Sequence, residues 1–268
     1  MACFRPLPLK GRGLVPCGKC VPCILRHRSD WTVRLREELK RCPSALFVTL
    51  TYDDSSLPLN SDGLPVVCKN DVQLYFKRLR RAGLTFRYFL ISEYGPSKGR
   101  PHYHFVGFGL EEKDISTLHR CWTCPKTGIP KGFVTADSVT LGRLDYVANY
   151  CLDKSNAPRM HPNFLLSSRR PAIGQSYLSD ALKDYHRRTL STVVRYHGIK
   201  NPLPRYYRDK IFDDSMKAEI REESQTRHNV EFQKLINCYG KQAAENRLYR
   251  QNAFEDIKVK SLIKKRKL

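Results

Sequence analysis

Two short apolar segments on either side of a loop rich in glycine and proline constrain the fold of this chain more than any other feature. Residues 84–92 (LTFRYFLIS) and 102–108 (HYHFVGF) are rich in β-branched and aromatic residues, which favours strands. The loop of residues 95–101 is short enough for the two segments to pair as a hairpin. We therefore expect a sheet that contains this hairpin.

The segments around the hairpin show strand and helix patterns in turn. Residues 45–52 (ALFVTLTY) and 133–139 predict two further strands. Residues 70–83 and 111–122 have the spacing of helices, and the first of these is amphipathic. The order β-α-β-β-α-β predicts an α+β fold of the ferredoxin-like type, an antiparallel sheet with these helices on one face. Such a fold says little about function without its site.

Composition divides the chain into three expected parts. Residues 1–42 combine an arm rich in proline, glycine and cysteine with a helix that we expect over residues 29–40. Residues 43–210 contain the predicted sheet. Residues 211–268 are basic and highly charged, with sparse apolar positions, so we expect a mostly helical extension that is partly disordered at its end.

The charge of the chain favours a polyanionic partner. Lysine and arginine number 48 against 26 acidic residues, which gives a formal charge of +22. Nucleic acid is the first candidate. A membrane surface is disfavoured, because no long apolar run, lipidation signal or strongly amphipathic basic helix accompanies the charge. The candidate phosphate contacts are Arg78, Arg80, Arg81, Arg169 and Arg170.

The chain has ten cysteines. Residues 1–9 lack the continuous apolar stretch of a secretory signal, so we expect a reducing cytoplasm and no disulfides. Two C-x2-C patterns offer enough thiolates for a structural Zn²⁺. The thiolates in question belong to Cys17, Cys20, Cys23, Cys121 and Cys124. The alternative is that they are small buried apolar residues, since no feature of the sequence brings the two groups together.

Two histidines in the second strand of the hairpin form a candidate metal site. His102 and His104 are two residues apart and therefore point to the same face of a sheet. Glu93, at the end of the neighbouring strand, can lie beside them. Such a set leaves coordination positions for water and a phosphate oxygen, so we predict Mg²⁺ or Mn²⁺ acting on a phosphodiester. The alternative is a pair of half-exposed polar positions.

A later helical segment, residues 143–153, carries candidate nucleophiles. Tyr146 and Tyr150 are four residues apart and share one side of this helix, while its apolar residues fall largely on another. Lys154 continues the tyrosine stripe and could stabilise a developing phenolate. The helix can lie across the open face of the sheet. The alternative is an aromatic contact that merely supports the helix.

These motifs resemble those of the HUH endonucleases, and within them the replication initiators of microviruses of the gokushovirus type. Three motifs follow the order of the family: FVTLTY (47–52), PHYHFVGFG (101–109) and YVANYCLDK (146–154). The N-terminal CGKCVPC with its spacing to Arg26 and Trp31, and PRYYRDK (204–210), also resemble this subgroup. The resemblance covers residues 15–210. One departure is Asp153, whose carboxylate would weaken the positive field beside Lys154.

The resemblance implies that His102 and His104 bind the metal, with Glu93 as a third ligand, and that Tyr146 and Tyr150 are nucleophiles. In the implied rolling-circle cycle, one tyrosine nicks the origin of the double-stranded replicative form, keeps the 5′-phosphate and leaves a 3′-OH primer. The second cuts the regenerated origin, and the released 3′-OH attacks the first phosphotyrosine to close a single-stranded circle. The implied partners are origin DNA, single- and double-stranded, and a helicase and DNA polymerase in the cytoplasm of the bacterial host.

Three rival functions stay open. A non-enzymatic nucleic-acid binder with an RNA-recognition type of sheet has the same element order, and Tyr52, Tyr94 or Phe108 could stack on bases, but the sequence lacks the aromatic signature of such sheets. A zinc-finger regulator would bind DNA through residues 17–23 alone. A metallophosphoesterase that uses water would leave no protein linked to DNA.

Overall fold

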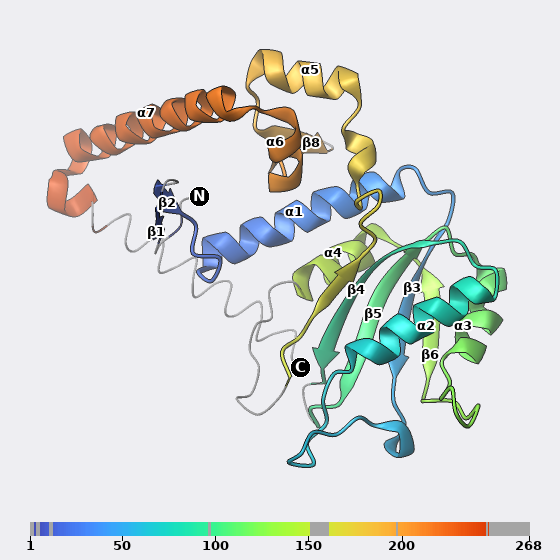
Figure 1. The fold of residues 1–268 in the computed structure, drawn as a ribbon. Helices are drawn as coiled ribbons and strands as arrows, with labels where there is room; N and C mark the ends of the chain where they lie inside the picture. Colours follow the sequence, from blue (N-terminus) through green and yellow to red (C-terminus); the bar gives the residue numbers. More distant parts are fainter. Residues whose placement is uncertain are drawn as a thin grey trace. The chain divides into compact units, whose positions relative to one another are not determined.

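The chain is described from a computed structural model (Figure 1). It describes residues 3, 6–10, 13–95, 98–150, 161–196, 198–244 and 246. Two compact units are present: Trp31–Tyr177, and Met1–Asp30 together with Leu178–Leu268. The domain boundaries expected after residues 42 and 210 stay a prediction. No helix in the described part of the chain is both long and apolar enough to cross a membrane.

A five-stranded antiparallel sheet forms the centre of the unit Trp31–Tyr177. Every neighbouring pair of strands is antiparallel. In spatial order the strands are β6 (Val134–Ser138), β3 (Ala45–Thr51), β5 (Pro101–Phe108), β4 (Arg87–Tyr94) and β7 (Leu165–Ser167). The predicted α+β class and antiparallel sheet are confirmed. The edge strand β7 was not predicted, because three residues are too few to show an alternating pattern.

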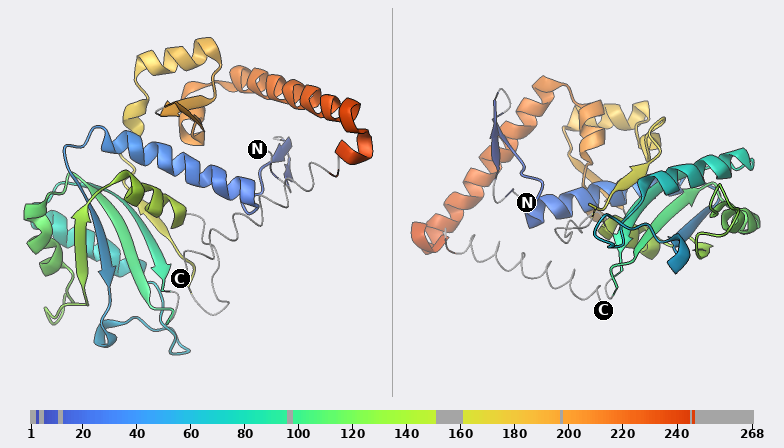
Figure 2. Two further views of the ribbon diagram at one scale, coloured as in Figure 1. Left: turned by 180° about the vertical axis from the view of Figure 1, so that it is seen from behind. Right: turned by 60° about the horizontal axis from the view of Figure 1, so that its bottom comes forward.

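Helices cover both faces of this sheet (Figures 1 and 2). α2 (Lys69–Arg81) and α3 (Ile115–Cys121) pack on one face, where they share an apolar core with β3 and β5. α4 (Leu141–Tyr150) packs on the other face, together with residues 31–39 of α1 (Val21–Leu39). Two short 3-10 turns flank strands or helices, η1 (Asp54–Ser56) and η2 (Glu112–Asp114), and a third is η3 (Gln175–Tyr177).

Alternation along β3 explains how one sheet supports two cores. Leu46, Val48 and Leu50 are buried against α2 and α3, while Phe47 and Thr49 point to the face that carries α4. α2 completes the first core with the buried residues Val72, Tyr75, Phe76 and Leu79. Full burial of one large apolar side chain contributes about 1.5–3 kcal/mol. The face with α4 is therefore left to position polar groups as well as apolar ones.

Most expected elements occur within a few residues of their predicted bounds, and α1 is the main correction. The helix expected over residues 29–40 begins at Val21, so part of the cysteine arm is helical. Pro22 does not prevent this, because the first turn of a helix needs no backbone donor from proline. The predicted N-cap of α2, Asn70, lies inside the helix, and Cys68 occupies the cap position without a side-chain hydrogen bond.

The other unit consists of short hairpins and helices. Its strands pair as β1 (Leu7–Leu9) with β2 (Gly13–Val15) and β8 (Val193–Tyr196) with β9 (Ile199–Pro202). Its helices after residue 178 are α5 (Asp180–Thr189), α6 (Arg205–Ile211) and α7 (Asp214–Tyr239). α7 is the long exposed helix expected near the C-terminus, and the side chain of Asp213 caps it by accepting the N–H of Met216 at 2.9 Å. The expected basic tail lies outside the described residues.

Candidate functional site

The β4–β5 hairpin brings Glu93, His102 and His104 together. Its register pairs Glu93 directly with His102 and Ile91 with His104. Oε2 of Glu93 lies 3.2 Å from Nε2 of His102 and 3.5 Å from Nε2 of His104. One ligand atom from each residue lies within 4.8 Å of the other two. The three residues predicted as metal ligands thus form one cluster.

Burial and hydrogen bonding set the charges of this cluster. The exposed fraction of the side chain is 16% for Glu93, 20% for His102 and 9% for His104. Burial raises the pKa of Glu93, but hydrogen bonds from the two histidines outweigh it and lower this pKa to about 2. Burial lowers the pKa of His104. At neutral pH the cluster therefore contains an ionised carboxylate and a neutral imidazole at His104, the forms that bind metal ions.

The Nδ1 atoms of both histidines face other groups, which orients the rings. Thr49 on β3 lies opposite His104 on β5, and its Oγ1 is 2.9 Å from Nδ1 of His104. Nδ1 of His102 is 3.3 Å from the carbonyl oxygen of Arg100. Partners of this kind fix the ring orientation and tautomer of metal-binding histidines. Both Nε2 atoms consequently point to Glu93, and two imidazole nitrogens with one carboxylate oxygen fit a divalent cation.

α4 brings Tyr146 beside His104. The centroids of their rings are 5.7 Å apart and the rings meet edge to face. The Tyr146 ring also meets that of Phe47 at 6.1 Å. Its helix neighbours Val147 and Ala148 are fully buried, whereas Tyr146 is 37% exposed. Tyr146 therefore lies at the border of the apolar core, where a ligand from solvent can reach it.

Two ion pairs fix α4 on the sheet. Nη2 of Arg36 in α1 donates to both carboxylate oxygens of Asp145, at 3.1 and 3.0 Å. Arg143 pairs with Asp137 of β6 at 3.0 Å. All four side chains are partly exposed, and such pairs contribute at most about 1 kcal/mol each to stability. Their larger effect is geometric, because they flank Tyr146 and limit rotation of the helix that carries it.

Two predicted catalytic residues lie at or beyond the limit of the described chain. α4 ends at Tyr150, whose side chain is outside the described residues. Lys154 lies outside them entirely. The roles of both residues stay predictions.

The arginines of α2 lie on the face of the sheet opposite the metal cluster. Nε of Arg78 donates to the carbonyl oxygen of Cys121 at 2.8 Å and so joins α2 to α3. The guanidinium of Arg80 lies 5.5 Å from the ring centroid of Phe86. Arg81, in the last turn of the helix, is exposed. Arg78 therefore has a structural role, and the proposed phosphate contacts of all three stay predictions.

The second predicted arginine pair lies at another edge of the same unit. Arg169 and Arg170 follow β7 and are exposed. The preceding residue, Ser168, donates its N–H to the carbonyl of Tyr88 at the start of β4, whereas Glu93 is near the end of that strand. The structure thus does not bring these arginines to the metal cluster.

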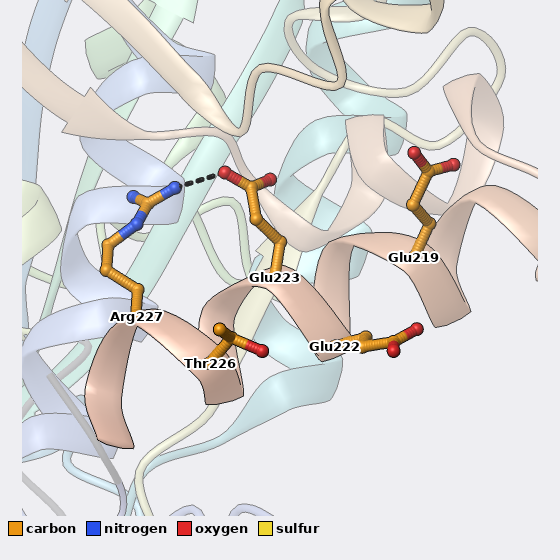
Figure 3. A pocket seen from close by; sticks show the side chains of 5 residues that line it. All are labelled: Glu219, Glu222, Glu223, Thr226 and Arg227. Carbon is orange, nitrogen blue, oxygen red and sulfur yellow. Dashed lines mark hydrogen bonds and ion pairs between the residues drawn. The ribbon is translucent and has the colours of Figure 1, made fainter. Parts of the chain in front are cut away.

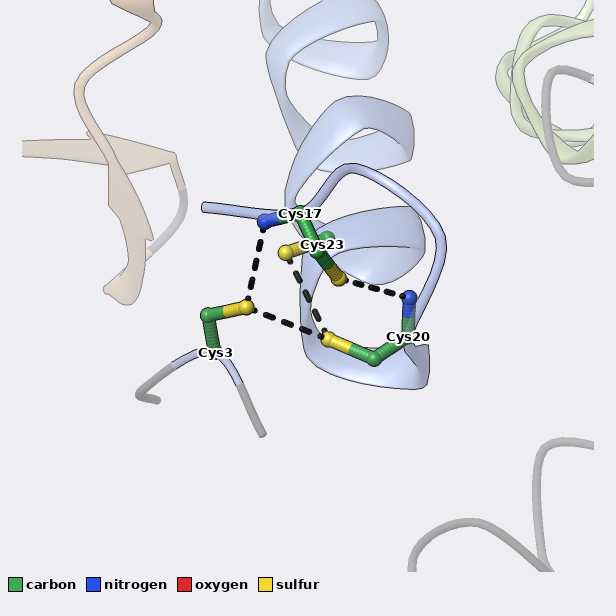
Figure 4. Close-up of side chains that lie close together, drawn as sticks. All are labelled: Cys3, Cys17, Cys20 and Cys23. Atoms are coloured by element: carbon green, nitrogen blue, oxygen red, sulfur yellow. Dashed lines mark hydrogen bonds between the residues drawn. The ribbon is translucent and has the colours of Figure 1, made fainter. Parts of the chain in front are cut away.

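Three of the five predicted zinc ligands come together with a cysteine that was not predicted. Cys17, Cys20 and Cys23 gather with Cys3 (Figure 4). The C-x2-C pair of residues 121 and 124 belongs to the other compact unit and is not part of this cluster. Cys3 was missed because it stands outside any C-x2-C pattern.

Two polar residues beside the cluster were also missed. Thr49 lies in an apolar strand motif, and only the register of β3 against β5 reveals that it faces His104. Asp145 precedes Tyr146 and its partner, Arg36, is 109 residues away. Alternation along residues 45–52 could have indicated the first. Nothing in the sequence indicates the second contact.

A hollow beside α7 is not part of this site. All of its lining residues belong to that one exposed helix: Glu219, Glu222, Glu223, Thr226 and Arg227 (Figure 3). Glu223 and Arg227 form an ion pair across one helical turn. A surface made by a single helix does not enclose a ligand, so we assign no function to it.

Known proteins provide the last observation. Residues 45–155 match the family model of Replication-associated protein ORF2. The chain is 30% identical over 228 residues to Replication-associated protein ORF2 of Spiroplasma virus 4, covering 78% of this chain and 69% of that protein. It is 30% identical to Replication-associated protein VP4 of Bdellovibrio phage phiMH2K, covering 72% and 66% of the two chains.

A third relative is Replication-associated protein ORF4 of Chlamydia phage 1, which is 27% identical, with 74% of this chain and 53% of that protein covered. No solved structure matches the chain. The region matched by the family model begins with β3 and extends past α4, so it contains both the Glu93–His102–His104 cluster and Tyr146. The chain belongs to the family of microvirus replication-associated proteins.

Proposed function

We propose that this protein is a metal-dependent DNA endonuclease that initiates rolling-circle replication by nicking one strand with a tyrosine. One observation carries the proposal: the ring of Tyr146 lies 5.7 Å from that of His104, in a cluster of three metal-binding side chains. Membership of a family of replication-associated proteins supports an action on viral DNA. A partly exposed phenol beside a metal site is the arrangement that strand transfer needs.

The donor atoms support a divalent cation, Mg²⁺ or Mn²⁺, at the cluster. Nε2 of His102, Nε2 of His104 and one oxygen of Glu93 would hold it, since these atoms lie within 4.8 Å of one another. When bound, the ion supplies Lewis-acid polarisation of the scissile phosphate. Three protein ligands leave room in its coordination sphere for water and a phosphate oxygen.

The tyrosine performs the transfer itself. The phenolic oxygen of Tyr146 loses its proton and attacks the phosphorus of the scissile phosphodiester. The bond from phosphorus to the 3′-oxygen breaks, and that oxygen takes up a proton and leaves as a 3′-OH. The 5′ end of the DNA stays joined to the tyrosine as a phosphodiester. Because one phosphodiester replaces another, the reverse reaction can rejoin the strand without an added energy source.

A second tyrosine would complete the cycle. In the proposed reaction one of Tyr146 and Tyr150 opens the origin of the double-stranded replicative form, and a host helicase and DNA polymerase extend the 3′-OH. The other tyrosine cuts the regenerated origin, and the released 3′-OH displaces the first tyrosine to circularise the strand. Two nucleophiles on one helix suit this alternation, because a small shift presents either one to the same phosphate. We expect these steps in the cytoplasm of the bacterial host.

The topology supports an assignment to the HUH class of ferredoxin-like folds. The chain order β3-α2-β4-β5-α3-β6 combines with the spatial order β6-β3-β5-β4. The histidine strand β5 is central, with β3 on one side and β4 on the other. A central strand is a rigid support for metal ligands.

The main alternative is a non-enzymatic binder that stacks bases on an open sheet. Such a sheet needs one face with exposed aromatic residues. Here α4 and α1 cover one face and α2 and α3 cover the other. Tyr52 and Phe108, both candidates for base stacking, are 3% and 1% exposed. The nuclease is therefore the better supported function.

A direct test uses single-stranded viral origin DNA labelled at its 3′ end, so that the fragment retained by the protein carries the label. The protein is incubated with Mn²⁺ and separated on a denaturing gel. We expect labelled protein with the wild type and with at least one of Tyr146→Phe and Tyr150→Phe, and none with the double variant or with EDTA. Tyr239→Phe, in α7, is the matched control and should behave as the wild type. Cleaved DNA without labelled protein would indicate water as the nucleophile and contradict the proposal.

A further inference from the structure

We propose that Cys3, Cys17, Cys20 and Cys23 together bind one structural Zn²⁺, which ties the N-terminal arm to the start of α1 (Figure 4). The site lies in the unit formed by Met1–Asp30 and Leu178–Leu268, whereas the Glu93–His102–His104 cluster lies in the other unit. The proposal does not depend on the nicking activity.

The distances between the sulfur atoms fit a single tetrahedral ion. Zn–S bonds of about 2.3 Å place the sulfurs of a tetrahedral site about 3.8 Å apart. Sγ of Cys3 and Sγ of Cys20 are 3.7 Å apart, and those of Cys20 and Cys23 are 3.5 Å apart. All four Sγ atoms lie within 4.8 Å of one another. The set therefore has the size of a zinc site with four thiolate ligands.

The same distances argue against disulfides. A disulfide joins its sulfurs at about 2.05 Å, well below either separation. Two separate disulfides would also draw the four sulfurs into pairs, whereas Sγ of Cys20 lies close to both Cys3 and Cys23. In Figure 4 all four side chains point toward one another from three directions. One shared ion accounts for this convergence, and two bonds do not.

Backbone N–H groups point at the sulfurs, as they would at thiolates. Cys17 donates its N–H to Sγ of Cys3 at 3.2 Å. Lys19 and Cys20 both donate their N–H groups to Sγ of Cys17 at 3.4 Å. The turn that allows this includes Gly18, at φ +71°, a value that favours glycine. Hydrogen bonds to a charged acceptor stabilise it, and metal-bound thiolates are charged.

The helix α1 adds to this stabilisation. The carbonyl of Cys20 accepts the N–H of Ile24 at 3.0 Å, so Cys20 is at the N-cap and Cys23 is in the first turn. A helix N-terminus carries partial positive charge and stabilises thiolates. α1 has no acidic residue in its first turn that would compete for this field.

The arm has little else to hold it in place. Its hairpin, β1 with β2, is only three residues long on each side. Leu7 and Leu9 of β1 are 53% and 47% exposed, so they do not anchor it in a core. An isolated two-stranded hairpin is marginally stable in water at best. A zinc ion bound by Cys3 before the hairpin and by Cys17 after it would close this loop, as metals do in other small segments.

The test measures zinc in the full-length protein, expressed with zinc and purified under reducing conditions without chelators. Elemental analysis should find one zinc per chain. Cobalt substituted for zinc should give the intense absorption of a tetrahedral thiolate complex. Alkylation with and without a strong chelator should show four cysteines, identified by mass spectrometry as the proposed four, that become reactive only when the metal is removed.

Variants then locate the ion. Cys3→Ser and Cys20→Ser should each lose at least tenfold in zinc affinity. Three controls should keep one zinc per chain: Cys238→Ser in α7, the double variant Cys121→Ser/Cys124→Ser, and His102→Ala/His104→Ala. The last control separates this site from the proposed catalytic metal.

Several results would overturn the proposal. These are a wild-type chain without zinc after reconstitution, iron in place of zinc, a disulfide among the four cysteines in the reduced protein, or loss of zinc from the Cys121/Cys124 variant. If Cys3→Ser did not fold, the alkylation pattern of the wild type would still decide the question, because unprotected thiols at the four positions contradict a bound ion.

Discussion

The side chains of the candidate metal centre are oriented by neighbours on the strands around them. His104 is held between the hydroxyl of Thr49, at 2.9 Å from Nδ1, and the carboxylate of Glu93 on its other nitrogen. The ring of Phe47 stacks on that of His104 at 5.6 Å. These contacts leave His104 one orientation, which is what a preorganised ligand requires.

At this scale, Thr49→Val should weaken metal binding. Valine keeps nearly the same volume but cannot hydrogen-bond to Nδ1 of His104. We expect the affinity for Mn²⁺, measured by calorimetric titration, to fall about 10- to 100-fold, as is usual for the loss of such a partner. Thr49→Ser, which keeps the hydroxyl, should bind nearly as the wild type. Equal affinities for the valine variant and the wild type would show that Thr49 does not orient the ligand.

Among the secondary-structure elements, α4 decides whether a tyrosine meets the metal site. The apolar side of α4 packs into the core around Leu144 and Val147, and Asp145 is tied to Arg36 of α1. The packing supplies stability, and the ion pair sets the rotation of the helix. Tyr146 stands next to Asp145, so a small rotation would move the phenol away from His104.

Asp145→Asn should therefore slow strand transfer without affecting the metal. The amide cannot accept two charge-assisted hydrogen bonds from Arg36, and a misplacement of about 1 Å can cost up to about 100-fold in rate. We expect the rate of covalent adduct formation to fall at least tenfold at saturating DNA, with Mn²⁺ affinity unchanged. Asp180→Asn, which removes a carboxylate from an exposed ion pair in α5, is the control. A parallel loss of Mn²⁺ affinity would argue against a positioning role.

The connection into β6 depends on a glycine. A Cβ atom at Gly132, where φ is +150°, would come within 2.3 Å of the carbonyl oxygen of Thr51 at the end of β3. Gly128 in the same loop has φ +72° but open space around it. Gly128→Ala should thus cost about 1 kcal/mol through its backbone alone, and Gly132→Ala at least about 2 kcal/mol more through the clash. Urea denaturation of the two variants measures this difference, and equal losses would refute the clash.

Much of this architecture follows from sequence pattern, and the rest depends on contacts that pattern does not encode. The alternation in β3 and the helical spacing in α2 predict these elements, because each buries one regular face. The His-x-His spacing likewise predicts two converging imidazoles. The contact of Cys3 with Cys20 was not predictable, because it depends on how a short hairpin folds back. The ion pair of Arg36 with Asp145 depends on the packing of two helices over a sheet.

At the scale of the whole molecule, the formal charge of +22 belongs to a chain whose relatives are replication-associated proteins. A polycation of this kind gathers DNA through phosphate contacts whatever its sequence, and releases counterions from the DNA as it binds. The charge accounts for attraction to DNA and says nothing about which phosphate is cut. Selection of the scissile phosphate belongs to the metal cluster and the tyrosine helix.

Binding of origin DNA should weaken steeply with salt. If the chain makes six to ten phosphate contacts, the affinity for DNA should fall roughly 10³- to 10⁵-fold between about 50 and 200 mM salt. Tyr146→Phe, which changes no charge, should show the same dependence on salt while losing or slowing covalent linkage. Fluorescence anisotropy with labelled DNA measures both proteins. An affinity that does not depend on salt would contradict a binding mode based on phosphate contacts.

The most direct test of the central claim is to identify the amino acid that carries the DNA. Trypsin cuts after Arg143 and Lys154, so both tyrosines lie in one peptide, LDYVANYCLDK. After reaction with origin DNA and Mn²⁺, nuclease trimming and digestion, fragmentation mass spectrometry should find a nucleotide phosphate on Tyr146 or Tyr150 of this peptide. A nucleotide on any other residue, or cleaved DNA with this peptide unmodified, would contradict the account.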